Sequence, residues 1–359
     1  GLVGSEMCIR DSFGSFPPLG DDSCKATHGI VHPCEAFRST RCCKDVATVR
    51  KNEYVNLPVI CLVGPTASGK SGLAVRVCRR LYVDEHPAEI INTDSMVVYR
   101  GMDIGTATPT LREQRTVVHH LVSILDVTVP SSLVLMQTLA RDAVEDCLSR
   151  GVIPVLVGGS ALYTKAIIDE MSIPPTDPEV RARWQEKLDA EGPRVLHDEL
   201  ARRDPKAAES ILPGNGRRIV RALEVIDLTG AFTATIPDGT LHWPKTVQMG
   251  LELSRKDIDQ RIADRVDQMW AYGFVDEVRS LANVGLREGL TASRALGYRQ
   301  VLEYLNGDYD EDEARRRTII GTRRFARKQL MWYRRDDRIE WFNALAPDPV
   351  SYTHLRAHE

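Results

Sequence analysis

The 359-residue sequence predicts an α/β fold, in which helices cover both faces of a parallel sheet and a helical insertion interrupts the chain. Short, continuous apolar runs at 59–63 and 152–157 are typical of strands that are buried on both faces of a sheet. Segments with helical periodicity alternate with such runs, which is the pattern of a parallel sheet. From about 172 to 240 the helical pattern continues with little strand signal, and this predicts the insertion.

Composition narrows the class of protein. Hydrophobic residues make up 43% and charged residues 27%, as in ordinary globular domains, and no apolar run approaches the length of a membrane-spanning helix. A net charge of −3 excludes a uniformly basic nucleic-acid coat but allows a local basic patch. Five of the eight cysteines precede residue 50, unlike the cysteines of a secreted disulfide scaffold. We therefore expect a cytoplasmic protein with no membrane segment.

The two ends of the chain show no element of this fold. Residues 1–50 lack helical or strand periodicity and the apolar run of a signal peptide. The extreme ends, GLVGSEMCIRDS and VSYTHLRAHE, resemble translated sequencing adapters. We expect 1–56 to be a disordered or artefactual segment and 346–359 an artefactual tail. A natural disordered N-terminal arm is the alternative for the first segment.

The first part of the core is predicted to span 57–171. Its first strand, 59–63, ends in glycine, and a helix follows at 71–81 with leucine and valine at helical spacing. The next predicted elements are a strand at 89–92, a third strand at 121–125, a helix from Ser131 or Ser132 to Arg150 that stops at Gly151, and a strand at 152–157.

The second part of the core is predicted to follow the insertion. The sequence IPPTDP is linker-like and opens the insertion, 172–240, and a second Pro-, Gly- and Thr-rich break lies at 230–245. The remaining core, 241–345, is predicted to contain a strand at 246–253, helices to about residue 335 of which the last is basic, and a short strand at 338–342.

A phosphate-binding loop follows the first strand. The segment matches G-x-x-x-x-G-K-[ST] and lies between an apolar strand and an amphipathic helix, as this motif requires. Its residues are Gly64, Pro65, Thr66, Ala67, Ser68, Gly69, Lys70 and Ser71. Backbone N–H groups and the helix N-terminus would hold a di- or triphosphate, Lys70 would supply a positive charge, and the Ser71 hydroxyl can ligate Mg²⁺. The predicted core is thus P-loop NTPase-like, and a structural glycine turn is the alternative.

A nucleotide hydrolase usually carries an aspartate at the carboxyl end of a strand near its phosphate loop, and the expected strand of this sequence has none. The strand at 152–157 ends in Gly158, Gly159 and Ser160, with no carboxylate for a metal-bound triphosphate. Asp94 instead follows the strand at 89–92, so we expect it at the carboxyl edge of the sheet near the phosphate loop. Asp94 is a candidate Mg²⁺ ligand or general base. The alternative is a structural role, in which its side chain only caps the turn.

Several stretches together resemble the tRNA dimethylallyltransferase family, also called tRNA isopentenyltransferases. The resemblance covers about 57 to 342 and rests on GPTASGKS (64–71), INTDSMVVYRGMDIGTATPT (91–110), HHLVSILDV (119–127), PVLVGGSALYTKAI (154–167), GRRIVRALEV (216–225), RALGYRQ (294–300) and TRRFARKQLMWYRR (322–335). It implies that dimethylallyl diphosphate donates a prenyl group to the exocyclic N6 of adenosine 37 beside the anticodon. The phosphate loop would then hold a diphosphate leaving group, with Mg²⁺ as cofactor.

The resemblance also assigns roles to residues. Asp94 matches the family's general base, which would accept a proton from the weakly nucleophilic adenine amine. Lys70, Arg265 and Mg²⁺ near Ser71 would stabilise the departing diphosphate, and Arg265 matches the family's diphosphate-binding arginine. By composition alone, Arg265 is one solvated helix arginine among many.

A basic segment predicts contact with RNA. Between 315 and 338 there are ten Lys or Arg residues against two Asp, although a solvated basic helix is the plain alternative. The resemblance places tRNA contacts on Asp94, Ser95, Met96, Val97, Ser160, Arg181, Arg217, Arg218, Ile219, Val220, Arg221, Arg294, Ala295, Leu296, Gly297, Tyr298 and Arg299. The insertion would lie along the anticodon stem-loop of the tRNA partner, and we expect the protein to act as a monomer.

Three other functions remain open from the residues alone. A small-molecule kinase would share the phosphate loop but leaves the basic helix unexplained. An isopentenyltransferase acting on free adenine nucleotides would need neither the insertion nor the Gly-Tyr-Arg segment at 297–299. An RNA-binding module with a vestigial phosphate loop would not need Asp94, Lys70, Ser71 and Arg265 together.

Overall fold

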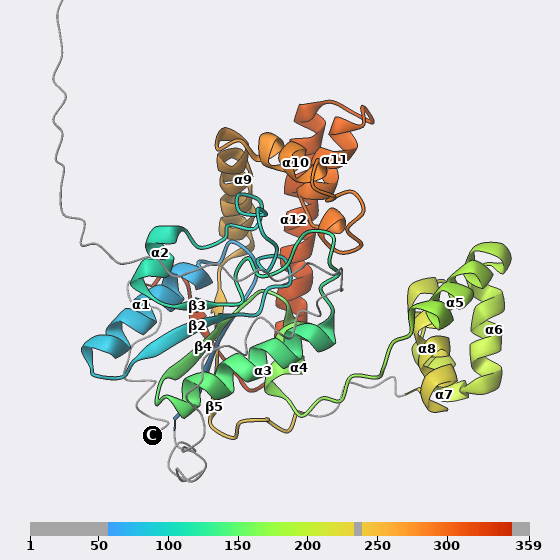
Figure 1. Cartoon of the computed structure of the whole chain (residues 1–359), viewed down its shortest axis with the longest axis horizontal. Coiled ribbons are helices and arrows are strands. Elements are labelled where there is room, and N and C mark those ends of the chain that lie inside the picture. Colours follow the sequence, from blue (N-terminus) through green and yellow to red (C-terminus); the bar gives the residue numbers. More distant parts are fainter. Residues whose placement is uncertain (1–56, 233–238, 347–359) are drawn as a thin grey trace, which may run out of the picture. The chain divides into compact units, whose positions relative to one another are not determined.

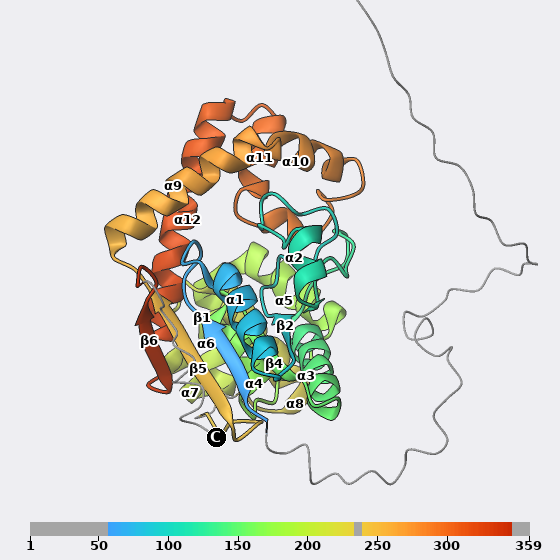
Figure 2. The same cartoon turned by 90° about the vertical axis from the view of Figure 1, so that its left-hand side faces the viewer.

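The computed structural model describes residues 57–232 and 239–346 and confirms the α/β fold. Six parallel strands form one sheet in the order β3-β2-β4-β1-β5-β6 (Figures 1 and 2). The strands are β1 Val59–Val63, β2 Ala88–Asn92, β3 His119–His120, β4 Ile153–Val157, β5 Thr246–Glu252 and β6 Ile339–Asn343. The prediction for 1–56, and that for the tail 346–359 apart from residue 346 itself, fall outside these described residues. None of the helices in the described ranges is long and apolar enough to span a membrane.

The two central strands explain the continuous apolar runs of the sequence. Every residue of β1 and of β4 is buried, and the two strands pair in parallel with Ile60 opposite Val155. A strand in this position has helices on both sides, so its inward and outward side chains are both apolar. The predicted bounds of β1 are confirmed, those of β2, β4 and β5 differ from the predicted ones by one residue at one end, and β6 is shifted by one residue at both ends.

Helices cover both faces of the sheet. On one face α1, Lys70–Val83, packs Leu73, Val77 and Leu81 against alternate residues of the strands. On the other face α3, Leu133–Ser149, and α4, Ala161–Ile168, pack against the remaining side chains. Ser132 begins α3, because its side chain accepts a hydrogen bond from Leu135 N at 3.1 Å.

The predicted third strand at 121–125 is wrong. The edge strand is β3, which pairs Ile90 with His119 and ends at His120. Leu121 and Ser123 take positive φ values of 61° and 51°, a conformation that cannot continue a strand. The segment that follows pairs with the loop after β2 instead, since the N–H groups of Ile124 and Leu125 both donate to Val98 O.

The helices after β5 form a second apolar core at the carboxyl end of the sheet. They are α9 Arg255–Ala271, α10 Phe274–Ala282, the 3₁₀ helix η2 Ala292–Arg294, α11 Tyr298–Leu305 and α12 Glu311–Tyr333. The buried side chains of this core include Met102, Val266, Phe274 and Tyr298. Figures 1 and 2 show α9 and α12 side by side, and the short α2, Leu111–Thr116, lies in the long connection between β2 and β3.

The segment predicted as an insertion contains four helices with a core of their own. They are α5 Pro178–Glu191, α6 Pro193–Arg203, α7 Pro205–Ser210 and α8 Gly216–Thr229. Proline at the first position starts three of them, where its missing N–H costs nothing. Trp184, Leu196, Leu200 and Leu223 are buried among these helices. The chain leaves and re-enters the core at neighbouring positions, because Asp169 bridges to Leu241 in antiparallel fashion.

Candidate active site

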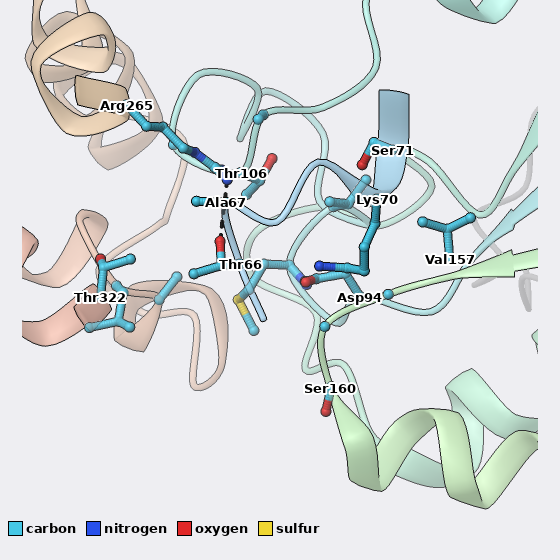
Figure 3. A pocket seen from close by; sticks show the side chains of 18 of the residues that line it. Thr66, Ala67, Lys70, Ser71, Asp94, Thr106, Val157, Ser160, Arg265 and Thr322 are labelled. Atoms are coloured by element: carbon cyan, nitrogen blue, oxygen red, sulfur yellow. Dashed lines mark hydrogen bonds between the residues drawn. The ribbon is translucent and has the colours of Figure 1, made fainter. Parts of the chain in front are cut away.

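A cavity of about 840 Å³ lies at the carboxyl ends of the central strands. The loops after β1, β2 and β4 line it, together with residues of α9, α12 and the segment around η2. In a parallel sheet this edge is where loops from separate strands converge and where ligands bind. Figure 3 shows that side chains far apart in the sequence, including Lys70, Asp94, Ser160 and Arg265, surround this cavity.

The phosphate loop has the backbone that its glycines permit. Gly64 has φ +142°, and a Cβ at this position would lie 2.7 Å from Leu251 O in the neighbouring strand. Gly69 has φ +93° and immediately precedes α1, so that the helix N-terminus points at the cavity. The loop thus forms a concave main-chain surface suited to an anion.

Lys70 is buried at the start of α1, and its Nζ donates to Pro65 O at 2.7 Å. Burial lowers the pKa of Lys70 to about 8, while the nearby Asp94 carboxylate favours the charged form and Arg265 opposes it. Lys70 and Asp94 point toward one another in Figure 3. A positive charge held out of water in this way interacts strongly with an anion placed beside it.

Asp94 is held by the turn that follows β2. Its N–H donates to Asn92 Oδ1, its carbonyl oxygen accepts from Asn92 Nδ2, and its Oδ1 accepts from Met96 N, each at 2.9 Å. Among the hydrogen bonds of the described residues, none involves Asp94 Oδ2. The turn therefore fixes the side chain while leaving one carboxylate oxygen available as a proton acceptor.

Arg265 reaches the phosphate loop from α9. Its guanidinium NH1 donates to Thr66 Oγ1 at 3.3 Å, the bond drawn in Figure 3. Burial lowers the pKa of Arg265, and the charge of Asp94 acts in the opposite direction. Although 199 residues separate Thr66 from Arg265, the fold brings this arginine to the phosphate loop.

Of the residues that the resemblance assigns to RNA contact, one group lines the cavity. This group comprises Asp94, Ser95, Met96, Val97, Ser160, Arg294, Ala295, Leu296 and Tyr298. Tyr298 is fully buried and donates through its hydroxyl to Glu277 Oε1 at 2.6 Å, so its ring is a wall of the site. Gly297 adopts φ +88° at the start of α11, and the exposed Arg299 lies 3.6 Å from Glu303.

A second group lies on the helices of the insertion and is not among the residues that line the cavity. Ile219 and Val220 are buried in the core of these helices. Arg181 and Arg221 both contact Glu224, whose side chain is 0% exposed, at 2.8 Å. Burial raises the pKa of Glu224, but hydrogen bonds from Thr176 and the two arginines outweigh it and lower the pKa. Arg217 and Arg218 lie on the surface at the start of α8.

The basic helix is more neutralised than its composition suggests. Of the ten cations of the basic segment 315–338, which extends past the end of α12 at Tyr333, six form ion pairs, namely Arg315, Arg316, Arg317, Arg323, Arg334 and Arg338. Their acidic partners lie mainly outside the counted segment, as with Asp267 on α9 for Arg315. Within the described ranges, Arg324, Arg327, Lys328 and Arg335 make no ion pair.

Sequence reasoning missed several residues of the site. Thr318, Thr322, Phe325 and Gln329 of α12 line the cavity at helical spacing, and Thr106 lines it from the loop after β2. Glu277 of α10 anchors that loop, because Oε2 accepts from the N–H groups of Asp103 at 3.1 Å and Ile104 at 2.7 Å. The helical spacing at which Thr318, Thr322 and Gln329 recur in the basic helix was the available signal for these polar residues.

The sheet, the phosphate loop and the carboxylate beside it define a P-loop α/β protein whose phosphate loop and a fixed carboxylate line the same cavity. The sequence model described as "IPP transferase" matches residues 97–336. The chain belongs to this IPP transferase family.

Proteins named as tRNA dimethylallyltransferases are similar to almost the whole described chain. The protein of that name from Cutibacterium acnes is 99% identical over 300 residues, which cover 84% of this chain and 94% of that protein. The one from Thermobifida fusca is 54% identical over 293 residues, covering 81% of this chain and 92% of that protein.

Solved structures of the family share the fold. The structure of the tRNA isopentenylpyrophosphate transferase from Bacillus halodurans is 36% identical, with a TM-score of 0.59, and covers 84% of this chain and 94% of that chain. The corresponding protein of Staphylococcus epidermidis is 27% identical with a TM-score of 0.61, and the match covers 84% of this chain and 100% of that chain.

Proposed function

We propose that this protein transfers a dimethylallyl group from dimethylallyl diphosphate to N6 of adenosine 37 in tRNA and releases diphosphate. Family membership supports the reaction. The main observation in its support is that one cavity is lined by Asp94, Lys70, Thr66 and Arg265. A prenyl transfer needs a proton acceptor at one end of the reacting pair and an anion site at the other, and this cavity offers both.

On the donor side, the protein stabilises the leaving group. As the bond between the allylic carbon and oxygen breaks, negative charge grows on the diphosphate. The phosphate loop and the buried Lys70 ammonium line the cavity, and the Arg265 guanidinium reaches the loop at Thr66, so these groups would lie beside that charge. Such preorganised donors stabilise charge more strongly than water does, because they need not reorient during the reaction.

On the acceptor side, Asp94 acts as general base. The adenine amine is a weak nucleophile because its lone pair is delocalised into the ring. As the new bond between N6 and the allylic carbon forms, the amine proton passes to Asp94 Oδ2, and Met96 N holds Oδ1 in place. General-base assistance of this kind is worth about 10²–10⁴-fold in rate.

Magnesium fits the oxygen ligands at the phosphate loop. The Ser71 hydroxyl and the Asp94 carboxylate both line the cavity, and oxygen ligands are those that Mg²⁺ prefers. We propose that Ser71 holds the ion. When bound, Mg²⁺ would neutralise charge on the diphosphate.

We propose that the RNA lies across the mouth of the cavity, with the insertion, 172–240, along the anticodon stem-loop. Unpaired cations of α12, such as Arg327 and Lys328, would contact phosphates. An adenine that reacts at its exocyclic amine must leave the base stack, and this is least costly in a single-stranded loop. Ser160 and Arg294 line the cavity where the extruded base would enter.

The test is to incubate the purified protein with dimethylallyl diphosphate, Mg²⁺ and an unmodified anticodon stem-loop, and to analyse nucleosides by mass spectrometry. We expect N6-dimethylallyladenosine on the stem-loop and none on a matched stem-loop with guanosine at position 37. Free AMP and ATP serve as parallel acceptors. Product on AMP alone would reassign the protein to free nucleotides, and ATP turnover without any prenylation would favour a kinase.

A further inference from the structure

A buried glutamine of α12 reaches the active site without a role in the chemistry described above. Gln329 is 6% exposed and follows Thr318, Thr322 and Phe325 on the face of α12 that lines the cavity. A buried carboxamide destabilises the fold unless its oxygen and its nitrogen are both hydrogen-bonded. The bonds that Gln329 makes therefore indicate what it does.

Gln329 connects two loops that belong to different strands. Its Oε1 accepts from Thr66 N at 2.9 Å, and its Nε2 donates to Gly159 O at 2.6 Å. Thr66 is in the phosphate loop after β1, and Gly159 is in the loop after β4, the strand paired with β1. Only a side chain with an acceptor and a donor at its tip can hold both main-chain groups at once.

One of these loops lies on the side proposed for the prenyl donor, and the other lies on the side proposed for the acceptor adenine. The Thr66 hydroxyl accepts from Arg265, so the donor-side arginine is attached to the same residue that Gln329 holds. Gly159 precedes Ser160, which lines the cavity on the side proposed for the acceptor. Gly159 also contacts the carboxamide closely, since a Cβ at this position would lie 2.5 Å from Gln329 Nε2.

We propose that Gln329 is a positioning residue that sets the separation between the diphosphate loop and the loop that carries Ser160. This inference rests on the proposed function. The reacting carbon and the adenine nitrogen must approach to about 3–3.5 Å, and a misplacement of about 1 Å can reduce the rate about 100-fold. A brace between the two loops therefore acts on the rate of bond formation, and it need not touch either substrate.

Two variants and a matched control test this role. Gln329→Met keeps the length of the side chain and removes both hydrogen bonds, and Gln329→Glu keeps an acceptor for Thr66 N but cannot donate to Gly159 O. Gln248→Met is the control, because Gln248 is a buried glutamine of β5 that does not line the cavity and whose Nε2 has no hydrogen-bond partner among the described residues. Each variant is characterised by its melting temperature and its affinity for the stem-loop.

We expect single-turnover prenyl transfer to fall about 10–100-fold in Gln329→Met and at least 10-fold in Gln329→Glu, with stem-loop affinity within about threefold of wild type. Hydrogen exchange of the peptide that contains Thr66 should become faster in Gln329→Met. Neither change should occur in Gln248→Met. If Gln329→Met shows faster hydrogen exchange but a transfer rate within threefold of wild type, the positioning role is wrong. An equal loss of transfer rate in Gln248→Met would also overturn it. If the wild-type protein does not prenylate the stem-loop, the proposed function fails, whereas the exchange experiment still tests the brace.

Discussion

Arg265 NH1 donates to Thr66 Oγ1 at 3.3 Å, and this bond joins the two parts of the core that the insertion separates in the sequence. Thr66 belongs to the phosphate loop near the start of the fold, and Arg265 belongs to α9, which follows the last buried strand. The proposed diphosphate site thus draws residues from both parts of the chain. Activity therefore reports on the whole core and not on the phosphate loop alone.

Replacing Arg265 should impair the transfer without unfolding the protein. We expect Arg265→Gln to lower kcat about 10²–10³-fold, because a preorganised cation is lost where charge develops on the diphosphate. Arg265→Lys should recover part of that loss. Steady-state kinetics with the stem-loop measures both. Arg255→Gln, at the exposed start of α9, is the control, and a similar loss there would show that the effect is not specific to the site.

Removing the carboxylate of Asp94 should slow the reaction while the turn stays intact. Asp94→Asn retains an oxygen that can accept from Met96 N, but it cannot take up the amine proton. We expect a loss of about 10²–10⁴-fold in kcat. Asp126→Asn, at an exposed ion pair with Arg100, should be near wild type. A rate for Asp94→Asn within about threefold of wild type would rule out the general-base role.

Binding of diphosphate should weaken at alkaline pH because of Lys70. Burial lowers the pKa of Lys70 to about 8, so in the free protein its positive charge is lost as the pH rises through that value. An anion prefers the protonated lysine, and the affinity for inorganic diphosphate should therefore fall above about pH 8. Calorimetry between pH 6.5 and 9.5 measures this.

Lys70→Arg is the matched variant for this pH dependence, since a guanidinium stays charged over the whole range. Its affinity should lack the decrease seen for wild type, and comparing the two proteins removes the titration of the diphosphate itself. Lys70→Ala should lose diphosphate binding but retain its affinity for the stem-loop. If wild type and Lys70→Arg weakened in parallel, Lys70 would not be the titrating group.

The sequence was sufficient for the central strands and for the phosphate loop, because both are local patterns. It failed at 121–125, where the residues are apolar enough for a strand but Leu121 and Ser123 take positive φ values. Backbone conformation of this kind depends on the contacts of the segment with 97–98 and leaves no trace in a hydrophobic pattern.

The parts of the site that lie far apart in the sequence were harder to predict. Arg265 entered through resemblance, since nothing in its local sequence distinguishes it from other helix arginines. The helical spacing of Gln329 with Thr318 and Thr322 indicates a shared face of the basic helix, but it does not indicate a contact with a loop 263 positions away. The RNA contact of the basic segment stays a prediction, and the sequence did not show that partners on other elements, such as Asp267 and Glu252, pair with some of its arginines.

The loop that contains Gly105 should tolerate no side chain at that position. A Cβ on Gly105 would lie 2.4 Å from the Tyr298 ring and 2.5 Å from the Phe274 ring, and both rings are fully buried. We expect Gly105→Ala to lower the free energy of unfolding by about 1–3 kcal/mol, the usual result of overpacking, and to reduce activity because this loop lines the cavity. Urea unfolding measures the first effect. Gly214→Ala, where a Cβ would meet nothing within 4 Å, should be neutral.

Glu89 should make the stability of the sheet edge depend on pH. Its carboxylate accepts two hydrogen bonds from Arg150, at 2.9 and 2.7 Å, and lies 2.6 Å from His120 Nε2, so β2, β3 and α3 are joined at one point. The bonds from Arg150, more than any other contact, lower the pKa of Glu89 from 4.5 to about 2. Because the pKa is lower in the folded state, this stabilisation is fully present above about pH 4.5 and is lost as the pH falls toward 2.

The variant Glu89→Gln isolates this contribution. We expect it to lower the free energy of unfolding by about 1–2 kcal/mol at pH 7, a value that allows for partial solvent screening, and by less than half of that at pH 3. Urea unfolding at the two pH values measures the difference. Asp126→Asn, which removes an ion pair exposed on both sides, should change stability by less than about 0.5 kcal/mol at either pH. Equal destabilisation of Glu89→Gln at pH 7 and pH 3 would mean that Glu89 contributes through packing and not through its charge.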